Sequence, residues 1–277
     1  MPQARISPQF PIGEQKINPA ENSQKVDVDS GAIQEKNSLA GRIAVVTGAS
    51  GGIGRAIAVA LSREGASVCA VGRNPVTLGE TVASAQMYSS ATGFQADLTS
   101  ENDLQTLLRH LEEADGLDIL VHCAGVIHQD VMEHARVQDL DLQYSTNVRA
   151  PYLLTQRLLP LLTAARGQIV FINSSVGLTA KRSNIGQYAA TKHALKAIAE
   201  SLREEVNPKG IRVLSVYLGR TATPMQEAIF RTEGKIYRPE TMLQPEDVAS
   251  TIIYALMLPA TAEVTDISIR PMVGTVS

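Results

Sequence analysis

Residues 42–54 read Arg-Ile-Ala-Val-Val-Thr-Gly-Ala-Ser-Gly-Gly-Ile-Gly, and this stretch decides the fold class. Its first half is a short run of β-branched and other apolar residues, which is typical of a buried strand. Its second half is rich in glycine, and residues 53–63 continue with apolar side chains at helical spacing. The stretch therefore predicts a strand, a tight turn and a helix in immediate succession.

The chain downstream repeats this alternation of apolar runs and helical segments. Further strands are predicted at 66–71, 93–96, 117–121, 168–172, 211–217 and 266–269, and helices at 76–87, 101–113, 138–165, 188–206 and 245–256. Alternating strands and helices indicate βαβ units, so we expect an α/β fold with a doubly wound, mostly parallel β-sheet flanked by helices, the Rossmann fold. Pro151 and Pro160 should bend or divide the long helix that contains them.

Composition indicates one globular domain with an N-terminal extension. The chain has 277 residues, of which 44% are hydrophobic, and its net charge of -3 favours neither a nucleic acid nor a membrane as partner. No run approaches the roughly 18 apolar residues that a membrane helix needs. Residues 1–39 mix prolines with polar residues without periodicity, so we expect a disordered extension there and the folded domain over 40–277. Targeting or partner binding by the extension is the alternative.

Cysteine and histidine positions favour neither a disulfide framework nor a metal site. Cys69 and Cys123 each lie in or just after an apolar run, and reduced core thiols are typical of a cytoplasmic protein. No metal-ligand grouping is predicted for the scattered histidines His110, His128, His134 and His193.

The glycine-rich turn predicts a dinucleotide site. Gly48, Gly52 and Gly54 follow a G-x-x-x-G-x-G spacing between the predicted strand and helix. Glycines let the backbone approach a pyrophosphate, and the helix N-terminus offers free N–H groups and the positive end of its dipole. Ser50 and Ile53 belong to the same turn and are expected to contact the same cofactor.

The end of the second predicted strand favours NADP over NAD. Dinucleotide folds often place an acidic residue about 20 positions after the turn, where it bonds the ribose 2′-hydroxyl of NAD. This chain has Gly72 and Arg73 there instead, and a guanidinium suits a 2′-phosphate. If Arg73 is only a solvated loop residue, NAD is also possible.

Two later strand ends supply further candidate contacts. Asp97, followed by Leu98, would either meet the adenine amino group or cap the next helix, although Ser100 is better placed as a cap. After the fourth strand, Ala124 and Gly125 are small enough for backbone to lie along the cofactor.

Tyr188 and Lys192 stand four residues apart in a predicted helix and therefore share one face. An ammonium close to a phenol stabilises the phenolate and lowers the pKa of the phenol. Such a tyrosine would serve as a general acid/base near neutrality. The spacing alone is also common on plain helix surfaces, so the rest of the chain must decide.

Together and in order, these motifs resemble the short-chain dehydrogenase/reductase family over about residues 39–272. The residues that carry the resemblance are Thr47-Gly48-x-x-x-Gly52-x-Gly54, Asp97, Ala124-Gly125, Asn147, Ser175, Tyr188-x-x-x-Lys192 and Gly219-x-x-x-Thr223. The chain departs from the family pattern at His122-Cys123, where Asn-Asn is common, and at Leu218, where proline is common. We interpret His122 as a packed strand-end residue.

The resemblance implies a role for each site residue. Tyr188 would exchange a proton with the substrate oxygen, and Lys192 would lower the pKa of that tyrosine and hold the nicotinamide ribose. Ser175, rather than its neighbour Ser174, would polarise the substrate oxygen. Asn147 would hold a water that connects Lys192 to solvent.

The function that the resemblance implies is NADP(H)-dependent interconversion of a small-molecule carbonyl and an alcohol, in a homodimer or homotetramer. Gly219, Thr221 and Thr223 would lie near the nicotinamide. The segment from Thr221 to Leu243 would form the far wall of the substrate site, with the apolar residues Met225, Ile229, Phe230, Tyr237 and Met242. An epimerase or dehydratase on the same scaffold, and a non-enzymatic NADP-binding regulatory protein, are the alternatives.

Overall fold

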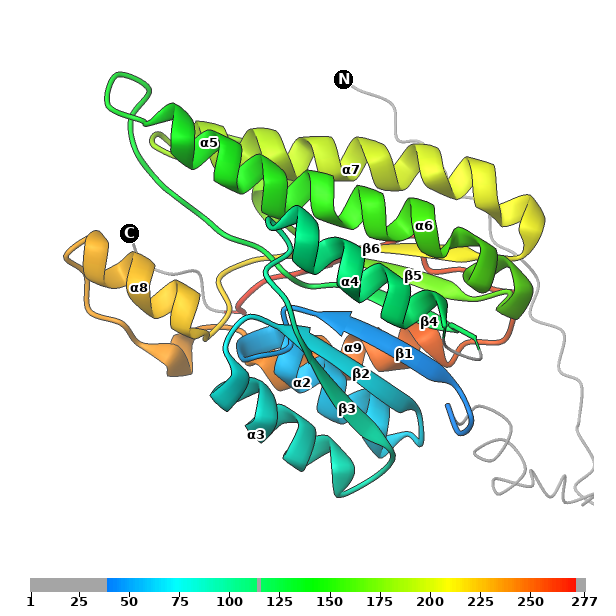
Figure 1. Ribbon diagram of the computed structural model, residues 1–277. Helices are drawn as coiled ribbons and strands as arrows, with labels where there is room; N and C mark the ends of the chain where they lie inside the picture. The colour runs from blue at the N-terminus through cyan, green and yellow to red at the C-terminus, as the bar shows by residue number, and fades with distance from the viewer. Residues whose placement is uncertain (1–38, 114–115, 273–277) are drawn as a thin grey trace, which may run out of the picture.

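The computed structural model describes residues 39–113 and 116–272, which form a seven-stranded parallel sheet covered by helices on both faces (Figure 1). The strands are β1 (Ile43–Thr47), β2 (Ser67–Gly72), β3 (Ala91–Gln95), β4 (Ile119–His122), β5 (Gln168–Ser174), β6 (Arg212–Leu218) and β7 (Asp266–Ile269). They are arranged in the order β3-β2-β1-β4-β5-β6-β7, and every neighbouring pair is parallel. The order reverses between β1 and β4, which is where ligands bind in sheets of this kind.

Helices pack on the two faces because side chains alternate along each strand. The helices are α2 (Gly52–Arg63), α3 (Pro75–Gln86), α4 (Glu101–Glu112), α5 (Val137–Tyr144), α6 (Ala150–Ala165), α7 (Gly186–Val206), α8 (Pro224–Thr232) and α9 (Pro245–Leu256). On β1, Ala44 and Val46 join the core under α2, α3 and α9, whereas Val45 joins the core under α4, α6 and α7. The doubly wound parallel sheet predicted from the sequence is thus confirmed.

The long helix predicted over 138–165 is interrupted by a π turn, η1 (Ser145–Arg149), between α5 and α6. Pro151 follows in the first turn of α6, where a missing N–H is tolerated. Pro160 lies inside α6 and does not divide it. Its exposed position leaves the carbonyl that has lost its helical donor open to water.

Polar residues at the carboxyl ends of the strands begin the following helices. Ser100 caps α4 by accepting from the N–H of Asp103, so the helix cap is Ser100 and not Asp97. Thr223 likewise caps α8, because its hydroxyl accepts from the N–H of Gln226. These caps fix where the helices start. Asp97 does not cap a helix and lies at the carboxyl edge of the sheet, after β3.

The predicted extension lies outside the described residues except for Leu39. Leu39 is buried, its N–H donates to the carbonyl of Glu64, and its own carbonyl accepts from Arg42. Leu39 is therefore already packed on the fold. Over the described ranges, none of the helices combines the length and the apolar character that crossing a membrane requires.

Candidate functional site

The turn after β1 opens a cleft at the carboxyl edge of the sheet. Gly48 has φ +68°, and a Cβ added to it would lie 2.7 Å from the Cα of Ala124, so only glycine lets β1 and the end of β4 come this close. Gly52 also has positive φ, at +53°, whereas Gly51 faces open space. No described side chain caps the start of α2, so the first N–H groups of that helix are left for a ligand.

A cleft of about 490 Å³ runs along this edge. Eleven of the predicted cofactor contacts line it, namely Gly48, Ser50, Gly52, Ile53, Gly54, Arg73, Asp97, Leu98, Ala124, Gly125 and Thr223. The structure therefore brings together residues that follow five different strands, β1, β2, β3, β4 and β6. Gly219 and Thr221 instead line an adjoining cavity with Tyr188 and Lys192.

Ser50 provides a direct test of whether the cleft fits a dinucleotide. Its Oγ is buried and has no hydrogen-bond partner among the described residues. A Cβ on Gly72 would lie 2.0 Å from this oxygen, so any side chain at Gly72 would displace Ser50. A hydroxyl without a partner, at the helix N-terminus and close to Arg73, fits a phosphate-bearing ligand.

Arg73 and Asp97 follow the ends of the neighbouring strands β2 and β3, and the charge of Arg73 acts on the Asp97 carboxylate. Burial raises the pKa of Asp97, but two hydrogen bonds from Thr99 and the charge of Arg73 outweigh it and leave the pKa below its ordinary value. The N–H and the hydroxyl of Thr99 both reach the Asp97 Oδ1, at 2.9 and 2.7 Å. Asp97 is thus an ionised carboxylate held in a short turn, and Arg73 is an exposed cation.

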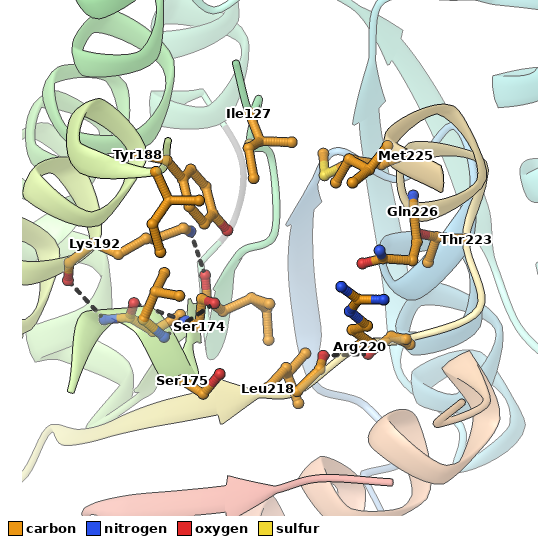
Figure 2. A pocket seen from close by; sticks show the side chains of 18 of the residues that line it. Ile127, Ser174, Ser175, Tyr188, Lys192, Leu218, Arg220, Thr223, Met225 and Gln226 are labelled. Atoms are coloured by element: carbon orange, nitrogen blue, oxygen red, sulfur yellow. Dashed lines mark hydrogen bonds between the residues drawn. The ribbon is translucent and has the colours of Figure 1, made fainter. Parts of the chain in front are cut away.

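A second cavity, of about 180 Å³, adjoins the cleft and holds the predicted catalytic residues. Figure 2 shows Ser174, Tyr188 and Lys192 on one side of it, and on the other side Arg220, Thr223, Met225 and Gln226. The cleft and the cavity share Ile53, Cys123, Gly125, Val126, Thr223 and Met225. A long ligand in the cleft would therefore end in the cavity.

Ser174, and not Ser175, contacts Tyr188. The Ser174 hydroxyl hydrogen-bonds the phenol and lies on the cavity side of the last residue of β5 (Figure 2). Ser175 begins the 3₁₀ turn η2 (Ser175–Gly177) and also lines the cavity, but its side chain is exposed and points away from the phenol. The predicted role of Ser175 in polarising the substrate oxygen stays a prediction, while in this structure its neighbour Ser174 makes the contact with the phenol. Side chains alternate at the end of a strand, so the residue at which β5 ends decides which serine faces inward.

Burial governs the pKa values of both Tyr188 and Lys192. It raises the pKa of Tyr188 to about 12, although the hydrogen bond from Ser174 works against the rise. It lowers the pKa of Lys192 to about 8. The Lys192 Nζ donates to the carbonyl of Ile172 at 2.9 Å and lies 5.8 Å from the centre of the Tyr188 ring. The pKa of Tyr188 is therefore raised, not lowered as expected from the sequence, because desolvation of the phenol exceeds the effect of the Ser174 hydrogen bond.

Asn147 lies in the π turn and binds the loop after β4. Its Oδ1 accepts from the N–H of Val126 at 2.9 Å, and its Nδ2 donates to the carbonyl of Val126 at 2.9 Å and to the Thr191 hydroxyl at 3.1 Å. A Cβ on Gly125 would lie 3.4 Å from the Asn147 Oδ1 and 4.0 Å from the Lys192 Nζ. The structure thus places the side chains of Asn147 and Lys192 both beside Gly125, while the predicted role of Asn147 in holding a water stays a prediction.

His122 is a packed strand-end residue, as predicted. Its Nε2 is 2.8 Å from the Thr155 hydroxyl, and its ring stacks on Phe171 with centroids 4.9 Å apart. Burial lowers the pKa of His122 to about 3, so the ring is neutral. Across residues 39–113 and 116–272, no three His, Cys, Asp or Glu side chains come together as a metal site requires.

The predicted far wall is formed only in part by its apolar residues. Met225 and Ile229 line the cavity, whereas Phe230 and Met242 are buried. Tyr237 packs its ring edge against Phe230. The sequence expectations did not include Arg182 and Arg220, which also line the cavity. Arg220 could have been expected in the site from the sequence, because it directly follows Gly219.

Comparisons with known proteins agree with this geometry. A family model described as short chain dehydrogenase matches residues 42–234. An uncharacterized oxidoreductase of Staphylococcus epidermidis is 34% identical over 233 residues, which cover 83% of this chain and 97% of that protein. Among solved structures, a dehydrogenase/reductase from Sinorhizobium meliloti has a TM-score of 0.75 at 30% identity, covering 86% of this chain and 97% of its own. The NADP active-site complex of Pseudomonas aeruginosa RhlG also has a TM-score of 0.75 at 30% identity, covering 86% and 98%.

Proposed function

Because this chain belongs to the short-chain dehydrogenase/reductase family and is an oxidoreductase, we propose that it interconverts a carbonyl and an alcohol with NADP(H). One observation carries the proposal: Ser174, Tyr188 and Lys192 line a single cavity that opens into the glycine-turn cleft. A hydrogen-bond donor, a phenol and an ammonium around one small cavity are the groups needed to move a proton to or from a substrate oxygen.

NADP(H) is the cofactor that the cleft suits best. The backbone of the glycine turn would hold the pyrophosphate, while Arg73 and the Ser50 hydroxyl would hold the 2′-phosphate. Among the similar solved structures, the RhlG structure and that of a metagenomic short-chain oxidoreductase are NADP complexes. The cofactor supplies the hydride, and the protein supplies orientation and the proton.

Tyr188 is the proton donor in the direction of reduction. With a pKa of about 12, its phenol is fully protonated at neutral pH and can donate to a carbonyl oxygen that gains charge as hydride arrives. The Ser174 hydroxyl would hydrogen-bond the same oxygen. Lys192, with a pKa of about 8, exchanges protons close to neutrality and would return one to the phenolate.

The proposal is tested by screening a panel of aldehydes and ketones for NADPH oxidation, with Tyr188→Phe as the matched variant. We expect the wild type to oxidise NADPH with at least one carbonyl. Tyr188→Phe should lose turnover while still binding NADPH, as measured by the fluorescence of the bound cofactor. Retained turnover in this variant would remove Tyr188 from the role of proton donor. A substrate converted without net NADPH oxidation would point to an epimerase or dehydratase instead.

A further inference from the structure

All the charged side chains that line the cavity beside Tyr188 are positive. Its charged residues are Arg182, Lys192 and Arg220, and none of the described residues that line it is an aspartate or a glutamate. Lys192 lies on the wall of the phenol, and Arg220 lies on the opposite wall with its guanidinium facing the cavity (Figure 2). A small cavity with cations on two sides favours a substrate that carries negative charge.

Arg220 is held in place but has spare donors. Its guanidinium carbon lies 4.7 Å from the centre of the Phe230 ring, and Phe230 is itself buried. The side chain is only 21% exposed. Within the part of the chain that the structure describes, its guanidinium donates no hydrogen bond, and its ion pair with Glu233 is 3.7 Å long. A guanidinium has five N–H donors, so those that face the cavity are free to bind an acceptor there.

Among the residues that the structure describes, the one carboxylate that pairs with Arg220 is shared among three cations. Glu233 lies 3.2 Å from Arg182, 3.1 Å from Lys235 and 3.7 Å from Arg220. Burial raises the pKa of Glu233, but these cations outweigh burial and hold the pKa below its ordinary value. Glu233 is thus ionised and balances only one of the three positive charges.

We propose that the substrate carries a carboxylate that Arg220 binds, with Arg182 beside it, and that the enzyme therefore acts on oxo acids or hydroxy acids. This inference rests on the proposed function. The planar fork of arginine matches a carboxylate, and low exposure strengthens the contact. Between the two ends the cavity offers an apolar lining of Ile127, Val176, Ile185, Leu218, Met225 and Ile229. The substrate is thus a small molecule with an apolar body, whose carbonyl lies at Tyr188 and whose acid lies at Arg220.

The test uses ω-oxo acids of increasing chain length, each paired with its methyl ester, at saturating NADPH. We expect the wild type to reduce at least one acid with a much lower KM than its ester. Arg220→Met should raise the KM for that acid by roughly ten- to a hundredfold, as expected when a charge-assisted hydrogen bond is lost. The KM for the ester and the dissociation constant of NADPH should stay unchanged.

Arg231→Met is the matched control. Arg231 lies on α8, pairs with Glu227, has a side chain that is 78% exposed and does not line the cavity. Arg231→Met changes the net charge as Arg220→Met does. Because Arg231 lies outside the cavity, the ratio of the KM for the acid to the KM for the ester should stay as in the wild type. If Arg220→Met does not fold, Arg220→Lys keeps the charge without the fork and should still raise the KM for the acid.

Two results overturn the inference while leaving the proposed function intact. One is equal KM values for acids and esters in the wild type. The other is an Arg220 variant in which the binding of acid, ester and NADPH is weakened alike, because the guanidinium would then bind the cofactor. If no carbonyl is reduced, the proposed function fails. Calorimetric titration of the NADP-saturated protein with the same acids then tests separately whether the carboxylate site exists. Binding that Arg220→Met removes supports the carboxylate site, and binding that is absent or unaffected refutes it.

Discussion

Asn147 and Val126 are joined by two hydrogen bonds of 2.9 Å, so that one carboxamide holds both the N–H and the carbonyl of one residue. The two bonds resemble the paired bonds between neighbouring β-strands, with the side-chain amide in place of one backbone. It fixes the loop after β4 to the π turn, 21 residues further along the chain. Gly125, the residue before Val126, is thereby held beside the Asn147 and Lys192 side chains.

Replacing Asn147 by alanine should therefore loosen the loop. The variant loses both bonds to Val126 and the bond to Thr191, and we expect the free energy of unfolding to fall by about 2 kcal/mol. NADPH should also bind more weakly, because Gly125 lines the cofactor cleft. Urea unfolding and cofactor titration measure the two effects. Asn102→Ala, on the exposed face of α4, is the control, and an equal loss of stability there would contradict the assignment.

Replacing each of the two neighbouring serines by alanine should affect kcat differently. Ser174→Ala removes the hydroxyl that bonds Tyr188, and we expect kcat to fall by about a hundredfold, the usual effect of losing one donor to a developing oxyanion. Ser175→Ala changes an exposed side chain and should alter kcat by no more than about twofold. Steady-state rates with the best carbonyl substrate give the comparison. The reverse order would restore Ser175 as the residue that polarises the substrate.

Arg73→Ala should weaken NADPH without comparable effect on NADH. An arginine pairing with a 2′-phosphate contributes a charge-assisted bond, so we expect roughly a tenfold or greater rise in the dissociation constant for NADPH alone. Titration of each cofactor by fluorescence gives the two constants. Arg109→Ala, an exposed arginine on α4, is the charge-matched control. Equal weakening of both cofactors would remove Arg73 from 2′-phosphate recognition.

Lys192→Met should raise the free energy of unfolding at neutral pH, and the increase should be smaller at alkaline pH. Burial lowers the pKa of Lys192 from 10.5 to about 8, so holding its charge below pH 8 costs the folded state about 3 kcal/mol. Losing the bond to Ile172 offsets about 1 kcal/mol, leaving a gain of about 2 kcal/mol at pH 7.

The pH dependence of this gain follows from proton binding. Between about pH 8 and 10.5 the unfolded chain keeps the lysine proton that the folded state has lost, so wild-type stability rises with pH. The advantage of the methionine variant should shrink over this window. Urea unfolding at about pH 7 and about pH 9.5 measures it, and a difference that does not change with pH would show that Lys192 is not desolvated.

The fold and most of the cofactor cleft could be predicted from the sequence because they depend on local chemistry. The strand-turn-helix of residues 42–54 is encoded by β-branched residues followed by glycines that tolerate positive φ, as Gly48 and Gly52 show. Helical spacing likewise places Tyr188 and Lys192 on one face. These properties concern residues close together in the chain, so pattern and spacing determine them.

Only the tertiary structure decided which serine faces Tyr188, which way its pKa moves, and what lies across the cavity. The inward serine depends on the residue at which β5 ends, and the pKa of Tyr188 depends on the removal of water by segments distant in sequence. Arg220 enters the site because Phe230 and Glu233 hold its guanidinium there. Burial and charge act through space between residues that the fold alone brings together, and no local pattern records them.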